Sequence, residues 1–295
     1  MNWFYRHDGP TWVVALVLYS AWAALIWFHE TLTWWIVAPV GTYLVAWHFS
    51  LQHEAIHSFR SVPKWLRWAV VMPPLGLWLP FPLYCAAHSK HHQNTHLTLP
   101  GVDTESFYVR QADWTTQSPL RHALLTMNLT LAGRVLLGPI LRLEKLITRE
   151  AEMLRNGDFS HVVHWIVHIV LVAALFWYIS AAGMKWWQYV LFIAWPAFGL
   201  GWVRSFAEHR YGQRPGQRTA ITESNVFWSV LFLNNNLHAV HHVFPKMPWW
   251  QIPGYWRAHR EQILAHNGNL YFKGYGEVAA KWLVKPIFSA PHPRW

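Results

Sequence analysis

Residues 33–57 read TWWIVAPVGTYLVAWHFSLQHEAIH, an apolar stretch that ends in two histidines. Its first part, 33–52, is long enough to cross a membrane, which takes roughly 20 mostly apolar residues. Its end, HEAIH, places His53 and His57 four residues apart, so a helix would present both imidazoles on one face. The stretch therefore predicts a membrane helix that ends in a pair of candidate metal ligands.

The composition of the chain is typical of an integral membrane protein. Of its 295 residues, 53% are hydrophobic and 13% are charged, whereas soluble domains carry about 25% charged residues. No Gly/Ser linker, repeat or low-complexity tract divides the sequence, so we expect a single domain over residues 1–295. Because Cys85 is the single cysteine, an intramolecular disulfide is excluded.

The apolar segments predict an all-α membrane protein with four transmembrane helices in two hairpins. The predicted spans cover about 11–28, 33–52, 162–180 and 186–203. A further apolar segment, 68–87, contains four prolines, and proline interrupts helices. Segment 120–141 is interrupted by basic residues and a histidine. We expect both of these segments to be interfacial or re-entrant.

The positive charges predict how the spans are oriented. With four spans, Lys185 is the one residue of the 24 Lys and Arg on the outer side, and these residues concentrate in cytoplasmic loops. We therefore expect both termini and the histidine-rich region in the cytoplasm. A basic surface there suits anionic lipid or an acidic protein. No nucleic-acid motif accompanies the charge, so we expect no nucleic acid partner.

Histidines cluster in two further places, HSKHH (88–92) and HAVHH (238–242), and His209 stands alone after the fourth predicted span. Together with the HEAIH pair they give nine candidate metal ligands: His53, His57, His88, His91, His92, His209, His238, His241 and His242. Spacings of i, i+3 and i+4 in HSKHH and HAVHH put these side chains on one helical face. Nine ligands exceed the four of a tetrahedral zinc site and suffice for two ions of higher coordination. Imidazole suits iron, zinc, copper and nickel alike, so ligand type does not choose the metal.

A shared metal cluster restricts how the chain can cross the membrane. His53 and His57 precede segment 68–87, and His88 follows it directly. If that segment crossed the membrane, it would separate these histidines. The segment should therefore dip in and return, or lie at the interface, below a cytoplasmic histidine-rich cap.

We call HEAIH, HSKHH and HAVHH the three histidine boxes. The chain resembles the integral-membrane fatty acid desaturase and hydroxylase family in these boxes, in their order and in its paired hydrophobic segments. HSKHHQNT (88–95) is similar to the family's second box with its trailing Asn-Thr. NNLHAVHHVFPKMPWWQIP (235–253) is similar to the third box and its proline- and aromatic-rich tail. The resemblance extends from the first predicted span to about Tyr255.

This resemblance implies a cofactor and a reaction. The nine histidines would hold two iron ions, and O2 and electrons would oxidise an unactivated C–H bond of a lipid or amphiphile. Fatty acyl desaturation is the expected outcome, with a hydroxylase or ketolase of the same family as the alternative. No catalytic residue beyond the metal ligands is expected. The chain carries no cytochrome b5-like domain, so a separate ferredoxin or rubredoxin with its reductase would supply the electrons.

The sequence departs from stearoyl-CoA desaturases in two places. Its first box has three residues between the histidines instead of four, and Ser205 stands where those enzymes have an Asn four residues before the extra histidine. The spacing of the first box makes the chain more similar to small bacterial members of the family, and Ser205 argues against an Asn contact to the metals at that position. We accordingly expect it in a bacterial inner membrane.

Two other classes of metalloprotein were compared with this interpretation. HEAIH also matches the H-E-x-x-H motif of zinc proteases, with Glu54 as the base, but this leaves HSKHH and HAVHH without a function. A bis-histidine haem protein would place single histidines inside the spans. In the di-iron oxidase interpretation, the histidines of all three boxes are metal ligands, and Glu54 accepts a hydrogen bond from an imidazole N–H. His96, Glu208 and Asn235 are further candidates for hydrogen-bonding to a metal ligand without binding the metal. His161, His164 and His168 form a stripe on one helical face, which could be functional or could be packed against other helices.

Overall fold

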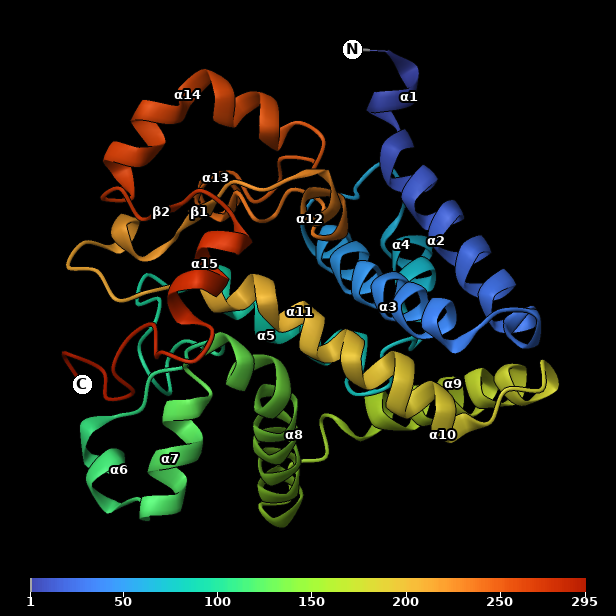
Figure 1. Ribbon diagram of the computed structural model, residues 1–295, viewed down its shortest axis with the longest axis horizontal. Coiled ribbons are helices and arrows are strands. Elements are labelled where there is room, and N and C mark those ends of the chain that lie inside the picture. Colours follow the sequence, from blue (N-terminus) through green and yellow to red (C-terminus); the bar gives the residue numbers. More distant parts are fainter. Residues whose placement is uncertain (1) are drawn as a thin grey trace. The chain divides into compact units, whose positions relative to one another are not determined.

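The computed structural model describes residues 2–295 and is mostly helical (Figure 1). The described chain forms two compact units, each built from two separate stretches: residues 2–85 with 139–201, and residues 86–138 with 202–295. Three helices run from one unit into the other: α5 (Phe81–Gln93), α8 (Leu131–Arg155) and α11 (Trp195–Glu208). Because neither unit is continuous in sequence, the single domain over residues 1–295 stays a prediction.

The first unit is built from the apolar helices. Its further elements are α1 (Trp3–Arg6), α2 (Gly9–Trp27), η1 (His29–Thr31), α3 (Trp34–His57), α4 (Lys64–Val71), α9 (Val162–Ala181), α10 (Trp186–Tyr189) and η2 (Val190–Ala194). Helices α2 and α3 pack side by side, joined by the 3-10 turn η1 (Figure 1). The Asp8 carboxylate accepts hydrogen bonds from the backbone N–H groups of Arg60 and Ser61, at 2.9 and 2.8 Å. These bonds fix the segment after α3 against the start of α2.

Three helices are long and apolar enough to cross a membrane: Gly9–Trp27, Val162–Ala181 and Trp186–Glu208. They agree with three of the four predicted spans, and the last is longer than expected because it continues through the π-helical turn η2 into α11. The fourth predicted span forms α3, a 24-residue helix that does not reach the same hydropathy. Polar residues in its second half, among them His48, His53 and His57, lower its mean hydropathy. The total of four spans therefore stays a prediction.

Segment 68–87 is broken, as its prolines predict. Helix α4 ends at Val71 and α5 begins at Phe81. Two carbonyl groups in the irregular stretch between them accept side-chain hydrogen bonds: the Tyr189 hydroxyl donates to Leu75 at 2.8 Å, and His168 Nε2–H donates to Leu77 at 2.7 Å. Irregular backbone at membrane depth needs such internal partners.

Segment 120–141 is also broken, while its interfacial or re-entrant position stays a prediction. It forms α7 (Pro119–Met127) and the start of α8, which meet at a bend of 119°. A Cβ atom at position 133 would lie 1.9 Å from the Met127 carbonyl oxygen, so this close approach requires Gly133. The buried Arg134 guanidinium lies 3.4 Å from the centre of the Phe107 ring, and Arg134 Nε donates to the Asn128 carbonyl at 2.8 Å.

The second unit combines short helices with one small sheet. Its further elements are α6 (Gln111–Thr116), α7, η3 (Pro215–Arg218), β1 (Ile221–Thr222), α12 (Val226–Leu231), α13 (His238–Val243), α14 (Ile252–His266), β2 (Tyr271–Phe272) and α15 (Tyr275–Trp282). The parallel pair β1–β2 departs from the predicted all-α fold. A buried cluster that includes Ile221, Val240, Ile252 and Trp256 packs β1, α13 and α14 together. This cluster holds α13, which carries the third histidine box.

Candidate metal centre

Helical spacing brings the histidines of each box together. Helix α5 carries His88, His91 and His92, and α13 carries His238, His241 and His242. His209 directly follows α11. His53 and His57 lie at the end of α3 in the first unit, both buried, with ring centroids 5.0 Å apart. The other seven histidines all belong to the second unit and form two groups there.

Four histidines of the second unit form a ring of nitrogen atoms: His91, His209, His238 and His242. Successive Nε2 atoms around this ring are 3.1, 3.1, 3.1 and 3.3 Å apart. Two nitrogens bound at right angles to one ion at ~2.1 Å lie roughly 3 Å apart. The ring therefore has the size that a single metal ion requires.

The hydrogen bonds that the imidazoles form on the side away from the ring of Nε2 atoms decide which imidazole nitrogen carries the proton. His91 Nδ1 lies 2.7 Å from the Asp103 carboxylate, and His209 Nδ1 lies 3.1 Å from the Arg218 carbonyl oxygen. Because both partners can only accept, both Nδ1 atoms must donate. When the imidazoles are neutral, as metal binding requires, their Nε2 atoms turn their lone pairs toward the centre of the ring. Lone pairs that face one another call for a cation between them, so this donor set fits a metal ion.

A second group contains His88, His92 and His241, whose ligand atoms all lie within 4.8 Å of one another. The Nε2 atoms of His92 and His241 are 3.1 Å apart. His88 Nδ1 donates to the Glu105 carboxylate at 2.7 Å, which leaves its Nε2 as the ligand atom. The second unit therefore offers three imidazoles for a second ion.

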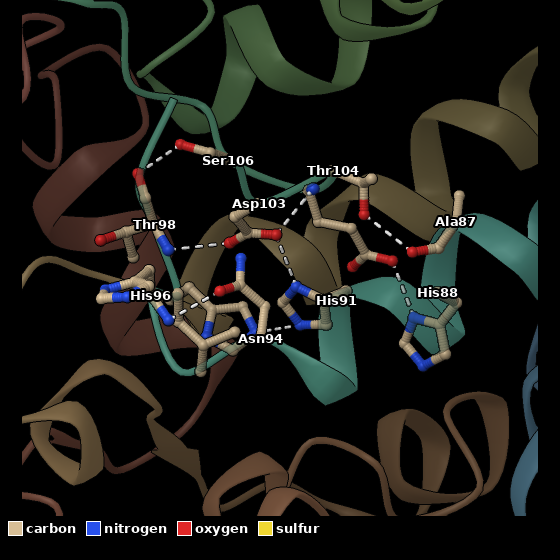
Figure 2. Close-up of polar contacts among 12 residues, drawn as sticks. Ala87, His88, His91, Asn94, His96, Thr98, Asp103, Thr104 and Ser106 are labelled. Atoms are coloured by element: carbon tan, nitrogen blue, oxygen red, sulfur yellow. Dashed lines mark hydrogen bonds and ion pairs between the residues drawn. The ribbon is translucent and has the colours of Figure 1, made fainter. Parts of the chain in front are cut away.

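A short loop supplies one carboxylate to each group. Figure 2 shows His91 directed at Asp103, whose other oxygen accepts the backbone N–H of Thr98 at 2.7 Å. The backbone N–H of Glu105 donates to Asp103 at 2.9 Å, while the side chain of Glu105 contacts His88. A carboxylate behind a histidine fixes the orientation of the ring and makes it a stronger ligand. Neither acid is predictable from the sequence, since DTE (103–105) lies in a loop and shows no periodicity that relates it to the histidines.

The two carboxylates also dominate the electrostatics around His91. Burial opposes a charge on His91, but Glu105 and Asp103 outweigh it and raise the pKa of His91 to about 9. Burial likewise opposes ionisation of Glu105, yet His91 and His88 hold the pKa of Glu105 well below its usual value. Both acids are therefore ionised beside the histidines.

The remaining histidines of the ring are disfavoured as cations. Burial and the neighbouring His91 lower the pKa of His209 to about 3. Burial and adjacent histidines hold the pKa values of His238 and His242 well below 6.5. Neutral imidazole is the form that binds a metal, so these side chains are ready to bind near neutral pH.

The residues predicted to lie behind the ligands have different surroundings. Asn235 Oδ1 and Glu208 Oε1 each lie 3.1 Å from His238 Nδ1, where we expected such partners. Arg204 also forms an ion pair with Glu208. Glu54 is buried near the end of α3, and its partnership with an imidazole stays a prediction. His96 is exposed and belongs to neither histidine group.

The three histidines at the start of α9 and just before it have contacts within the first unit. His161 Nδ1 lies 3.0 Å from the Glu150 carboxylate, and His168 donates to the Leu77 carbonyl. His164 lines a small cavity of ≈ 150 Å³ within the first unit. For His161 and His168 the contacts favour the packed interpretation over a catalytic one.

Apolar helices of membrane-spanning length and two groups of imidazoles fit a membrane protein with histidine groups that could hold metal ions. Residues 30–274 match the sequence profile of the family described as "Fatty acid desaturase", so the chain belongs to the fatty acid desaturase and hydroxylase family. No curated protein matches the chain. Membership makes the protein an oxidoreductase and implies a lipid substrate and membrane association. It favours oxidation over the zinc protease that HEAIH alone would allow.

Proposed function

We propose that the protein uses two iron ions and O2 to oxidise an unactivated C–H bond of an amphiphilic lipid, with desaturation of a fatty acyl chain as the reaction. The observation that carries this proposal is the pair of imidazole groups, since their inward-facing nitrogen atoms suit metal cations. The similarity to small bacterial members of the family remains part of the proposal.

Nine histidines would hold the two ions. His91, His209, His238 and His242 form one ligand set, supported by the ring of Nε2 atoms. The other set consists of His88, His92 and His241, completed by His53 and His57 from the end of α3.

When bound, the irons would supply the redox chemistry that activates O2. The protein's own residues have three tasks. Asp103 and Glu105 hold a proton on Nδ1 of His91 and His88, so that Nε2 stays a ligand. Asn235 does the same for His238. Burial of these histidines keeps water from competing for the ligand atoms.

Electrons would come from a separate protein of the ferredoxin or rubredoxin type with its reductase. We place the metal centre and both termini on the cytoplasmic side of a bacterial inner membrane, because this orientation leaves Lys185 alone outside among the 24 Lys and Arg. On that side a soluble electron carrier could reach the protein.

Metal analysis and product analysis test the proposal together. Protein purified in nanodiscs should contain about two irons per chain, as expected for two sets of imidazole ligands. Incubation with O2, a reductase and ferredoxin, followed by untargeted mass spectrometry, should yield a lipid that has lost two hydrogen atoms. A product that has gained one oxygen would instead identify a hydroxylase. One tightly bound zinc with full activity in the absence of iron would contradict the proposal.

A further inference from the structure

A polar pocket of ≈ 660 Å³ opens in the second unit. It lies among the loop before α12, the start of α14 and the start of α15, with Glu223, Trp228, Trp256, Arg257, Lys273 and Tyr275 in its lining. Sites for small molecules commonly have volumes of about 300–1,000 Å³. The size of this pocket suits an organic ligand better than a lone ion.

The charges around the pocket favour an anion. Arg257 and Lys273 are both exposed in its lining. Among the described lining residues, Glu223 is the one carboxylate. It already accepts hydrogen bonds from Trp256 Nε1–H, at 2.7 Å, and from the Tyr271 hydroxyl, and Arg260 lies 3.8 Å away. Glu223 stays ionised, but the nearby Arg260 offsets its charge. Glu277, which accepts the backbone N–H of Lys273, is paired with Lys281. Arg257 and Lys273 therefore leave the pocket with a net positive charge.

The aromatic side of the pocket continues into an exposed apolar surface. The rings of Trp228 and Tyr275 lie 5.0 Å apart and form one wall. On α12, Val226 is 77% exposed and Phe227 is 51% exposed, and they stand between the lining residues Asn225 and Trp228. An amphiphile could thus place its charged end by the cations and its chain along the aromatic wall and α12.

We propose that this pocket binds the anionic head group of an amphiphile, a carboxylate or a phosphate, whose apolar chain packs on Trp228 and the exposed face of α12. This inference rests on the proposed function, because it makes such an amphiphile the substrate of the metal centre. It assigns Arg257 and Lys273 to substrate binding rather than to metal binding.

The floor of the pocket is connected to a metal ligand by a short turn. Asn234, Asn236 and Leu237 line the pocket, while Asn235 within the same turn contacts His238. Leu233 and Asn234 have positive φ values of 46° and 56°, a region that costs non-glycine residues energy. A ligand in the pocket should therefore affect the position of His238 through this constrained turn.

Binding of three probes tests the proposal: decanoate, 1-decanol and acetate. They present chain with charge, chain without charge, and charge without chain. Equilibrium dialysis against phosphatidylcholine nanodiscs that hold the full protein, corrected with empty discs, should show decanoate bound roughly tenfold more tightly than either other probe. The double variant R257Q/K273Q should lose the preference over 1-decanol, and the matched control R155Q, an exposed arginine of α8, should keep it.

The outcomes separate this inference from the proposed function. Equal binding of decanoate and 1-decanol, or a preference that survives in R257Q/K273Q, overturns the pocket as an anion site. Acetate binding as tight as decanoate shows a small-anion site only and also overturns it. The charge-reversed variant R257E/K273E, with unchanged iron content and thermal midpoint, should favour 1-decanol. Dialysis is also run on metal-free protein, so that probe binding is measured independently of iron. The result then holds even if the di-iron proposal is wrong.

Discussion

At the scale of single residues, the position of a proton decides whether these imidazoles can bind a metal. A neutral histidine has one nitrogen that donates and one that accepts. In His91 and His88, a carboxylate 2.7 Å from Nδ1 keeps the proton on the outer side. The ligand nitrogen is thereby fixed by residues 103–105, which do not themselves belong to either imidazole group.

Replacing Asp103 with Asn should weaken one metal site. An amide can turn its NH2 group toward His91 Nδ1, which would move the imidazole proton to Nε2 and remove the ligand lone pair. We expect a loss of ~10–100-fold in iron affinity at that site, measured by titration of metal-free protein with Fe²⁺. The same change at Asp113, which pairs with Arg110 on the exposed helix α6, is the control. Equal affinities for both variants would show that Asp103 does not orient the ligand.

Substitutions of Glu54 and His241 distinguish the oxidase interpretation of HEAIH from the protease interpretation. If Glu54 supports an imidazole, Glu54→Gln should lower activity or iron affinity by roughly 10–100-fold. If it were the base of a protease, the same variant would keep its metal and lose all turnover. His241→Ala removes an imidazole whose Nε2 lies 3.1 Å from that of His92, so iron and activity should both disappear. A His241→Ala protein with full metal and activity would refute the oxidase.

At the scale of helices and loops, the sequence predicted what is periodic and missed what is not. The i, i+3, i+4 spacing placed the boxes on α5 and α13, and the prolines of 68–87 predicted the break between α4 and α5. The carboxylates of Asp103 and Glu105 reach the histidines because the loop folds back over α5, and no local pattern encodes that return. The helix α3 was expected as a span, although its polar second half lowers its hydropathy.

Packing of α13 against the sheet should control metal retention. Val240 is fully buried in the cluster with Ile221 and Trp256, so Val240→Ala removes two methyl groups from a filled core. We expect a loss of about 2 kcal/mol in the free energy of unfolding, seen as a lower thermal midpoint, with weaker iron binding. Val243 on the same helix is 43% exposed, and Val243→Ala should change little. Equal midpoints would show that this cluster does not hold the box in place.

At the scale of the whole molecule, the apolar helices set the membrane character, and the charges set the proposed orientation. The orientation can be measured with single cysteines in a Cys85→Ser background. Lys185→Cys lies in the turn after α9 and should react from outside intact cells with an impermeant maleimide. Arg155→Cys and Arg257→Cys should react after lysis only. Labelling of Lys185→Cys that also requires lysis would reverse the proposed topology.

Acidification should release the metal and destabilise the protein together. His209, His238 and His242 have pKa values that burial lowers in the folded protein, whereas unfolded histidine titrates near about 6.5. As the pH falls below that value, the unfolded chain takes up protons that the folded chain does not bind, so the free energy of unfolding decreases. Above about 6.5, these three histidines are neutral in both the folded and the unfolded state, and stability should be nearly independent of their titration.

The loss of iron on acidification should be steeper than the loss of stability, because several imidazoles must stay neutral at once to bind the metal. Because the pKa of His91 is raised to about 9, iron already displaces one proton from this ligand at neutral pH. Iron content measured after dialysis at a series of pH values should therefore fall most steeply below about 6.5, where more than one proton per ion competes. Iron that remained fully bound down to about pH 4 would show that imidazoles are not its ligands.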